Sequence, residues 1–297
     1  MINKGFFIIF LLSFLLPSPA WARVSGFGQL LGGESKQETI LNRFGDLLDF
    51  LIGQEREEEL AQSSTADVLG VTSLSDPEPT VSELTVVVLG DSMVDVLGGG
   101  LPQLRTALEK YFPKTKLNLY NFGVGATDME YALFRLTNSY QYMNRSYSPV
   151  LSVNPHVLVL ESFAYNNFGD SQEGLDKQWL LIAEIIDLTK KISPETKIVL
   201  ASTIAPNSLV YGDGIDGISW PPDQKMARVE TVKKYLQNMI NFATSEGYPL
   251  ADAFYPSMNE NGQGKLEYIS VADHLHLSGP GGVLFCQKVA ETISGLW

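Results

Sequence analysis

The sequence predicts an α/β protein whose sheet is mostly parallel, on two observations. Residues 85–89 form an unbroken run of β-branched and apolar side chains, typical of a strand buried on both faces. Strand and helix signals then alternate along the chain, which is the pattern of parallel strands joined by crossover helices. A length of 297 residues with 44% hydrophobic content is enough for one domain with a substantial core and an additional segment.

The elements can be placed in order along the chain. Strands are expected at residues 85–89, 116–120, 155–161, 197–201 and 248–251, and helices from 101 onward, at 127–145, 175–192 and 224–245, and after residue 278. Thr127 followed by Glu130 predicts a capping box, and Ser278 with Pro280 predicts the start of the last helix. The glycine-rich loop at 204–223 is unusually long for a loop that serves no site.

The N-terminus has the pattern of a signal peptide at residues 1–22. Lys4 precedes an apolar run at residues 6–16, and Ala20-Trp21-Ala22 fits the small-x-small cleavage pattern. The run is shorter than the about 20 residues that a membrane-spanning helix needs. Cleavage after Ala22 predicts a secreted or periplasmic protein with no integral membrane span. An uncleaved anchor is the alternative.

Residues 23–80 are expected to form an N-terminal extension. Apolar residues recur at helical spacing over about residues 38–60, and a polar linker rich in Ser, Thr and Pro follows. The other face of this helix is acidic, whereas a helix lying on a membrane usually carries Lys or Arg there. Packing on the main domain and a homodimer through helix 38–60 both remain open. The main domain is expected at residues 81–297.

Charge and cysteine content exclude several classes of protein. The net charge of −13 argues against nucleic acid and anionic membrane surfaces as partners. Cys286 is the only cysteine, so no internal disulfide can form.

Polar groups stand at the expected carboxyl ends of the strands, where open α/β sheets bind ligands. Ser92 follows the first strand, a glycine-rich turn at 123–125 follows the second, and Asn166 follows the third. Asp273 and His276 precede the last helix. A serine nucleophile needs a base, a group that orients the base, and donors for the oxyanion. The sequence offers a candidate for each.

These residues resemble a known family. Gly90-Asp91-Ser92, Gly123-Val124-Gly125, the Asn166 segment and Asp273-x-x-His276 are similar, in this order, to the four blocks of the SGNH (GDSL-type) hydrolases. The nearest branch is that of the platelet-activating-factor acetylhydrolase-like and lysophospholipase-like esterases. The resemblance covers about residues 81–297. It implies a flavodoxin-like, three-layer α/β/α sandwich around a mostly parallel five-stranded sheet.

The resemblance also implies roles for individual residues. Ser92 would be the nucleophile, His276 the general base and Asp273 the group that orients it. The oxyanion hole would comprise the Ser92 N–H, the Asn166 side chain and one second-block N–H, from Gly125 or Ala126. Ala126 and Ala164 stand where relatives usually carry glycine.

No cofactor and no metal is expected. A zinc site formed by Asp273, His274 and His276 is conceivable from the residue types, but the sequence shows no evident further ligand for it.

The implied function is that of a secreted serine esterase, which hydrolyses carboxylic (acyl or acetyl) esters through an acyl-serine intermediate. Export suits an acylated glycan or a lipid-derived ester as substrate. Two alternatives remain: an acyltransferase that uses the same triad on a glycan, and a catalytically silent glycan-binding module.

Overall fold

The computed structural model describes residues 81–297. The expectations for the signal peptide at 1–22 and the extension at 23–80, including helix 38–60 and a dimer through it, lie outside the described residues. Within the described part, no helix combines the length and apolar character required to cross a membrane.

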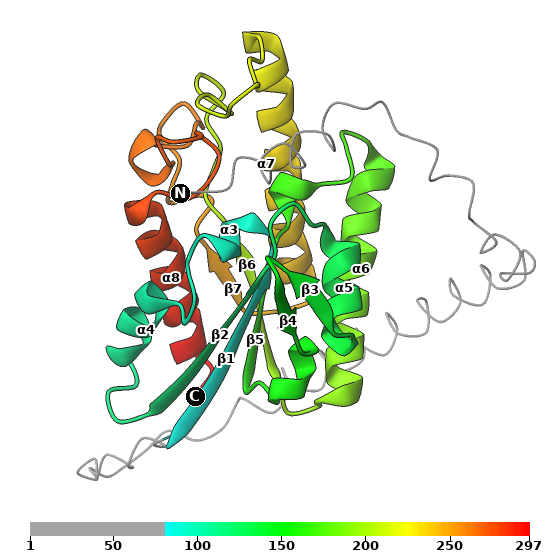
Figure 1. Cartoon of the computed structure of the whole chain (residues 1–297), viewed down its shortest axis with the longest axis vertical. Coiled ribbons are helices and arrows are strands. Elements are labelled where there is room, and N and C mark those ends of the chain that lie inside the picture. Colours follow the sequence, from blue (N-terminus) through cyan, green and yellow to red (C-terminus); the bar gives the residue numbers. More distant parts are fainter. Residues whose placement is uncertain (1–80) are drawn as a thin grey trace, which may run out of the picture. The chain divides into compact units, whose positions relative to one another are not determined.

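A five-stranded parallel sheet forms the centre of the domain (Figure 1). Its strands are β1 (Glu83–Gly90), β2 (Lys116–Gly123), β5 (Val157–Glu161), β6 (Lys197–Ser202) and β7 (Leu250–Asp252). Their order in the sheet is β2-β1-β5-β6-β7, and every neighbouring pair is parallel. The five strands predicted from the sequence are confirmed, with ends shifted by a few residues.

Helices cover both faces of this sheet. Helices α4 (Pro102–Glu109) and α8 (Gly279–Ser294) lie on one face, and α5 (Met129–Thr137), α6 (Gln172–Ile192) and α7 (Pro222–Ser245) lie on the other (Figure 1). The predicted three-layer α/β/α sandwich is therefore confirmed. The predicted start of the last helix is also confirmed, because the Ser278 hydroxyl accepts a hydrogen bond from the Gly281 N–H.

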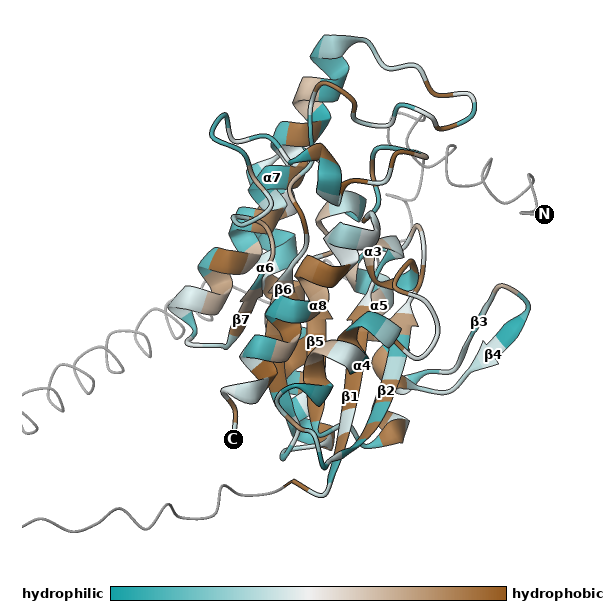
Figure 2. Cartoon of the chain, turned by 90° about the vertical axis from the view of Figure 1, so that its left-hand side faces the viewer, coloured by the Kyte–Doolittle hydropathy of each residue, from teal (hydrophilic) through white to brown (hydrophobic). Residues whose placement is uncertain are grey.

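The core explains why the first strand reads as an apolar run without alternation. Val87 and Leu89 pack into a cluster with Ile182 of α6 and Met239 of α7, and all four are fully buried. Val88 points to the opposite face and is equally buried. Figure 2 shows β1 and β5 largely in the hydrophobic colour. Each such side chain stabilises the fold by roughly 1.5–3 kcal/mol.

The expectation of a helix over residues 127–145 is wrong in its second half. Helix α5 ends at Thr137, and a hairpin follows, formed by β3 (Tyr140–Tyr142) and β4 (Arg145–Tyr147). Met143 and Asn144 both have positive φ, at 48° and 60°, which two-residue hairpin turns favour because their twist matches that of the strands. The rings of Tyr140 and Tyr147 stack at 5.0 Å across the hairpin.

The predicted capping box at the start of this helix is also wrong. Asp128 is the N-cap, and its carboxylate accepts a hydrogen bond from the Tyr131 N–H. The Thr127 hydroxyl instead donates to the Val124 carbonyl oxygen. The helix therefore starts one residue later than the capping-box pattern implies.

The strand order places a switch point between β1 and β5. From β1 the chain moves to β2 on one side, and from β5 it moves to β6 on the other side. In sheets of this kind the ligand site lies outside the carboxyl ends of the strands at such a point. Ser92 follows β1 and Asn166 follows β5, so both flank it.

Candidate active site

Ser92 lies in a tight turn between β1 and a four-residue helix, α3 (Ser92–Asp95), which the sequence analysis did not predict. The Asp91 carboxylate caps this helix by accepting a hydrogen bond from the Met93 N–H at 2.7 Å. Gly90 is required in the turn, because a Cβ there would lie 2.2 Å from the Val94 side chain. Ser92 thus occupies the first position of a helix at the edge of the sheet.

Asn166 is joined directly to this turn. It ends the 3-10 helix η3 (Ala164–Asn166), and its Nδ2 donates to the Asp91 Oδ2 at 2.8 Å. This hydrogen bond spans the switch point. The alanine at 164 causes no strain, because the left-handed residue of this segment is Phe163, with φ of 53°. The missing glycine therefore leaves the geometry of the loop intact.

The second glycine-rich segment lies beside Ser92. A Cβ built on Gly125 would be 3.7 Å from the Ser92 Cβ. The Gly125 N–H donates to the Tyr142 hydroxyl at 3.1 Å, whereas the Ala126 N–H makes no hydrogen bond to another described residue. Ala126 has a φ of 57°, in the left-handed region that glycine adopts most easily. Glycine, which the family resemblance leads one to expect at this position, would adopt this backbone conformation without strain.

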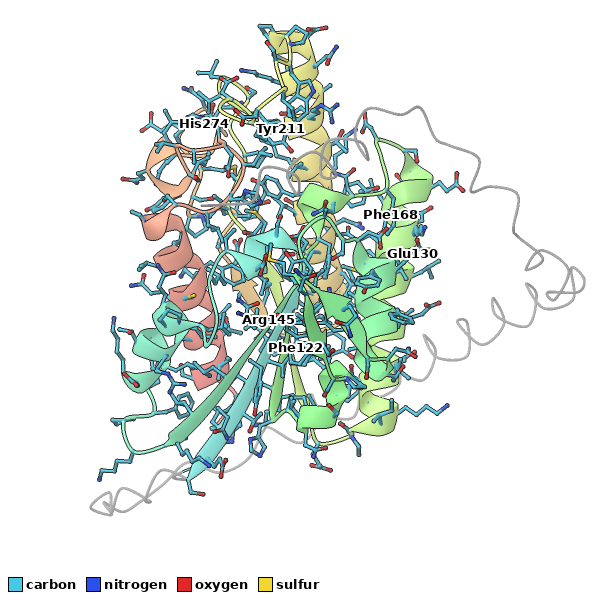
Figure 3. The ribbon with its side chains drawn as sticks, viewed as in Figure 1. Phe122, Glu130, Arg145, Phe168, Tyr211 and His274 are labelled. Atoms are coloured by element: carbon cyan, nitrogen blue, oxygen red, sulfur yellow. The ribbon has the colours of Figure 1, made fainter. Side chains whose placement is uncertain are left out.

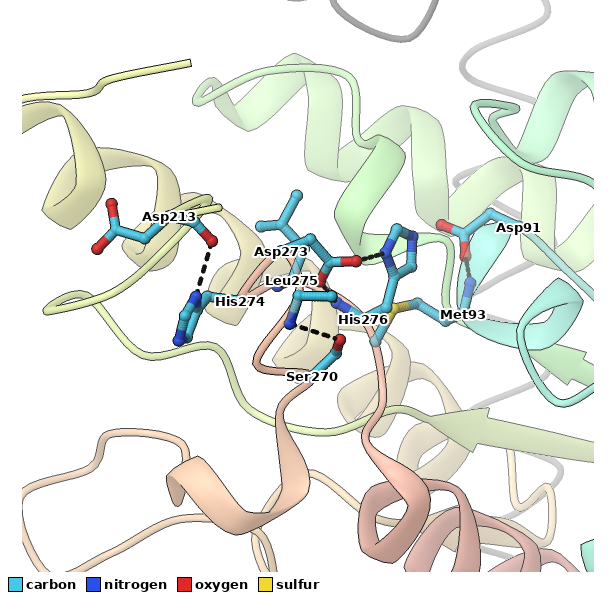
Figure 4. Close-up of polar contacts among 9 residues, drawn as sticks. Asp91, Met93, Asp213, Ser270, Asp273, His274, Leu275 and His276 are labelled. Carbon is cyan, nitrogen blue, oxygen red and sulfur yellow. Dashed lines mark hydrogen bonds and ion pairs between the residues drawn. The ribbon is translucent and has the colours of Figure 1, made fainter. Parts of the chain in front are cut away.

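Asp273 and His276 form a hydrogen-bonded pair within one loop (Figure 4). The Asp273 Oδ2 lies 2.8 Å from the His276 Nδ1, and the Asp273 Oδ1 accepts the N–H groups of Leu275 and His276. Burial alone would raise the pKa of the Asp273 carboxyl, but the hydrogen bond and charge of His276 outweigh it and lower that pKa. Because a carboxylate only accepts, Nδ1 carries the proton and Nε2 is left as the basic nitrogen.

The imidazole of His276 faces a second carboxylate. Figure 4 shows Asp91 on the side of the ring opposite Asp273. Burial raises the pKa of Asp91, and this is opposed by the hydrogen bonds from Met93 and Asn166 and then by the charge of His276. The structure thus brings Ser92, Asn166, Asp273 and His276 to one edge of the sheet.

Two buried charged residues near this edge were missed by the sequence analysis. The Arg135 guanidinium is fully buried; its Nη1 donates to the Phe122 carbonyl at 2.7 Å and its Nη2 to the Gly90 carbonyl at 3.1 Å. It therefore joins the ends of β1 and β2 directly below the serine turn. The only sequence signal was a basic residue on an apolar helix face.

Glu161 is the second of these residues and ends the apolar strand β5. Its carboxyl accepts from the Ser162 hydroxyl at 2.6 Å and from the Phe163 N–H at 2.8 Å. Burial and the charge of Asp91 raise the pKa of Glu161 well above its usual range. The hydrogen bonds from Met93 and Asn166 and the charges of His276 and Arg135 favour the ionised form of Asp91 and so oppose the effect of its burial on its pKa.

His274 points away from the Asp273–His276 pair. Its Nδ1 lies 2.7 Å from the Asp213 carbonyl oxygen, to which it donates (Figure 4). Figure 3 shows His274 and Tyr211 above the carboxyl ends of the strands, where the long loop before α7 lies. His274 therefore ties the loop that carries His276 to the long loop. Among residues 81–297, no three His, Cys, Asp or Glu side chains are grouped to hold a metal ion.

Comparison with known proteins places the fold. No protein-family model matches the sequence, and no curated protein matches it. Among solved structures, a candidate GDSL-like lipase from Parabacteroides merdae is 14% identical, with a TM-score of 0.51 over 74% of this chain and 100% of its own. A GDSL-like lipase from Bacteroides thetaiotaomicron is 16% identical, with a TM-score of 0.49 over 72% of this chain and 89% of its own.

A gut microbial diltiazem-metabolizing enzyme is 18% identical, with a TM-score of 0.50 over 73% of this chain and 48% of its own. The chain therefore spans about half the length of that enzyme. The parallel sheet with its flanking helices and the similarities at TM-scores of 0.50 and 0.51 show that residues 81–297 share the fold of these two solved structures, one of which is a candidate GDSL-like lipase.

Proposed function

We propose that the protein is a secreted serine esterase that hydrolyses carboxylic esters through an acyl-serine intermediate on Ser92. The observation that carries the proposal is the connected set of contacts at the switch point. Asp273 holds His276, His276 faces Asp91, and Asp91 joins the Ser92 turn to Asn166. This arrangement supplies a nucleophile, a base, an orienting group and a donor at one edge of the sheet.

The proposed reaction has two halves. His276 Nε2 takes the proton of the Ser92 hydroxyl as its oxygen attacks the ester carbonyl, and the carbonyl oxygen becomes an oxyanion. The C–O bond to the alcohol then breaks, and the imidazolium gives its proton to the leaving oxygen. Water, deprotonated by His276, attacks the acyl-serine; the acid leaves and the Ser92 oxygen takes the proton back. The Asp273 carboxylate holds the imidazole in the required tautomer throughout.

The oxyanion would be held by N–H donors that are fixed before the reaction. The Ser92 N–H belongs to the turn that Asp91 caps, and Asn166 is oriented because one of its amide hydrogens is used by Asp91. Its other amide hydrogen remains for the oxyanion. Such preorganised donors typically contribute a factor of about 10²–10³ each.

An extracytoplasmic ester, either an acylated glycan or a lipid-derived ester, is the proposed substrate class. The signal-peptide pattern at residues 1–22 supports export. The net charge of −13 favours neutral over strongly anionic substrates.

The test is to assay the full chain on p-nitrophenyl acetate and on longer p-nitrophenyl esters, with and without an acceptor sugar, beside the Ser92→Ala variant. The proposal predicts release of nitrophenol and free acid that Ser92→Ala abolishes. Transfer of the acyl group to the sugar in preference to water would instead indicate an acyltransferase. Glycan binding without turnover of any ester would indicate the silent module and contradict the proposal.

A further inference from the structure

The Tyr142 hydroxyl makes two hydrogen bonds beside the candidate nucleophile. It donates to the Asp95 Oδ2 at 2.7 Å and accepts from the Gly125 N–H at 3.1 Å. Tyr142 belongs to β3, in the hairpin that the sequence analysis had assigned to a helix. A Cβ on Gly125 would come within 3.1 Å of this hydroxyl and 3.7 Å of the Ser92 Cβ. The hydroxyl therefore lies close to Ser92.

These two hydrogen bonds connect separate parts of the site. Asp95 is the last residue of α3, and Ser92 is its first. Gly125 belongs to the loop that carries Ala126. The Tyr142 hydroxyl thus fixes the helix of the nucleophile relative to the second-block loop. Burial, followed by the hydrogen bond to Asp95, raises the pKa of Tyr142, so the hydroxyl keeps the proton that it donates.

The same contacts distinguish the two candidate oxyanion donors of this loop. The N–H of Gly125 is engaged by Tyr142, whereas the N–H of Ala126 has no acceptor among the described residues. Ala126 is also the residue with the left-handed φ of 57°. A strained backbone of this kind persists only where its surroundings hold it in place, and the neighbouring hydrogen bond is such a restraint.

We propose that Tyr142 is a positioning residue, which engages the Gly125 N–H and holds the loop so that the Ala126 N–H is the second-block oxyanion donor. The inference rests on the proposed esterase function and specifies which N–H of that site acts. Loss of the hydroxyl would free the Gly125 N–H and let the loop relax away from the reacting geometry. A misplacement of about 1 Å can cost on the order of a hundredfold in rate.

The experiment compares Tyr142→Phe with the matched control Tyr147→Phe on the adjacent strand. An oxyanion contact forms fully only in the transition state, so Tyr142→Phe should lower kcat about tenfold to hundredfold while KM stays within about twofold. Tyr147→Phe should leave both constants within about twofold of the wild type, because its ring stacks on Tyr140 away from Gly125.

A second pair of variants tests the same link from its other end. Asp95→Asn retains an oxygen that can accept from Tyr142, whereas Asp95→Ala removes it. Asp95→Ala should therefore lose more kcat than Asp95→Asn. Amide hydrogen exchange by NMR gives a readout independent of turnover. Exchange at Gly125 should become faster in Tyr142→Phe and stay unchanged in Tyr147→Phe.

The outcomes separate this inference from the function on which it rests. An active wild type whose kcat and Gly125 exchange are unchanged by Tyr142→Phe would overturn the role of Tyr142 and leave the esterase proposal standing. A folded wild type that turns over no ester would overturn both. A lower kcat at unchanged KM, seen in Tyr142→Phe and Asp95→Ala but not in Tyr147→Phe and with unchanged circular dichroism, supports the assignment.

Discussion

Two groups of ionisable residues at the edge of the sheet are built in opposite ways. Asp273 and His276 lie three residues apart in one loop, and their side chains are 14% and 15% exposed. Asp91, Arg135 and Glu161 come from three distant segments and are fully buried. The first group comprises the proposed base and its orienting carboxylate, whereas the second lies at the strand ends beneath Ser92, where Arg135 joins β1 to β2.

The difference shows what a charged group must do in each place. The side chain of His276 remains partly accessible to solvent and is held in place by the Asp273 carboxylate. A buried charge such as Arg135 costs several kcal/mol of desolvation and is tolerated only with partners in good geometry. The buried group therefore serves to fix positions, and its effects should appear in stability. Substitutions in the Asp273–His276 pair should instead lower the catalytic rate.

The largest effect is expected at the loop pair. His276→Ala should lower kcat/KM by about 10³–10⁴, because the base is lost while the oxyanion donors remain. Asp273→Asn should be impaired less, since the imidazole is kept but its orienting carboxylate is lost. The free energy of unfolding of both variants should stay within about 1 kcal/mol of that of the wild type. Steady-state kinetics from about pH 5 to about pH 9 test these expectations. Wild-type rates in His276→Ala would contradict the assignment of His276 as the base.

The next largest effect is expected in the buried group. Arg135→Met removes the donors to the Phe122 and Gly90 carbonyls and leaves Asp91 without its buried cation. It should lower the free energy of unfolding by about 3–5 kcal/mol. Exposed Arg145 provides the control: Arg145→Met should change it by less than about 0.5 kcal/mol. Equal urea midpoints for the two variants would contradict the role given to the buried cation.

The buried carboxyl of Glu161 should make the stability of the fold depend on pH. Burial raises its folded pKa above the unfolded value, so the folded state holds the proton more tightly. Its contribution to stability is fully present below the unfolded pKa and is lost as pH rises toward the folded pKa, at up to about 1.4 kcal/mol per pH unit.

Glu161→Gln, which cannot ionise, should remove this decline and be more stable than the wild type above neutral pH. Exposed Glu173 supplies the control, and Glu173→Gln should leave the wild-type slope unchanged. Urea denaturation at several pH values measures the free energy of unfolding of each variant as a function of pH. A wild type whose stability does not fall between acid and alkaline pH would show that Glu161 ionises without cost.

The smallest effect is expected at His274, although it is two residues from His276. Its ring donates to the Asp213 carbonyl of the long loop and does not face Asp273. His274→Ala should keep kcat/KM within about threefold and lose about 1 kcal/mol of stability. Loss of activity comparable to His276→Ala, with the fold intact, would reopen a metal site that uses both histidines.

The same contrast explains what the sequence could predict. The Asp273–His276 pair was predictable because both partners lie within one turn of chain, and the strands were predictable because each is a continuous apolar run. The role of Arg135 was not predictable, since its partners at Phe122 and Gly90 are brought near only by the folded sheet. The burial of Glu161 next to the charge of Asp91 likewise depends on the folded sheet. The β3–β4 hairpin was missed because the turn at Met143 and Asn144 lacks the glycine that usually signals it.

The identity of Ser92 as the nucleophile is the central claim, and covalent labelling tests it most directly. The full chain is treated with a fluorophosphonate, and the modified residue is identified by mass spectrometry of its peptides. A serine paired with a base is the species that such reagents capture. The account predicts one phosphonyl group per chain, located on Ser92, absent from Ser92→Ala and strongly slowed in His276→Ala. Labelling that persists in folded Ser92→Ala, or that maps to another serine, would contradict it.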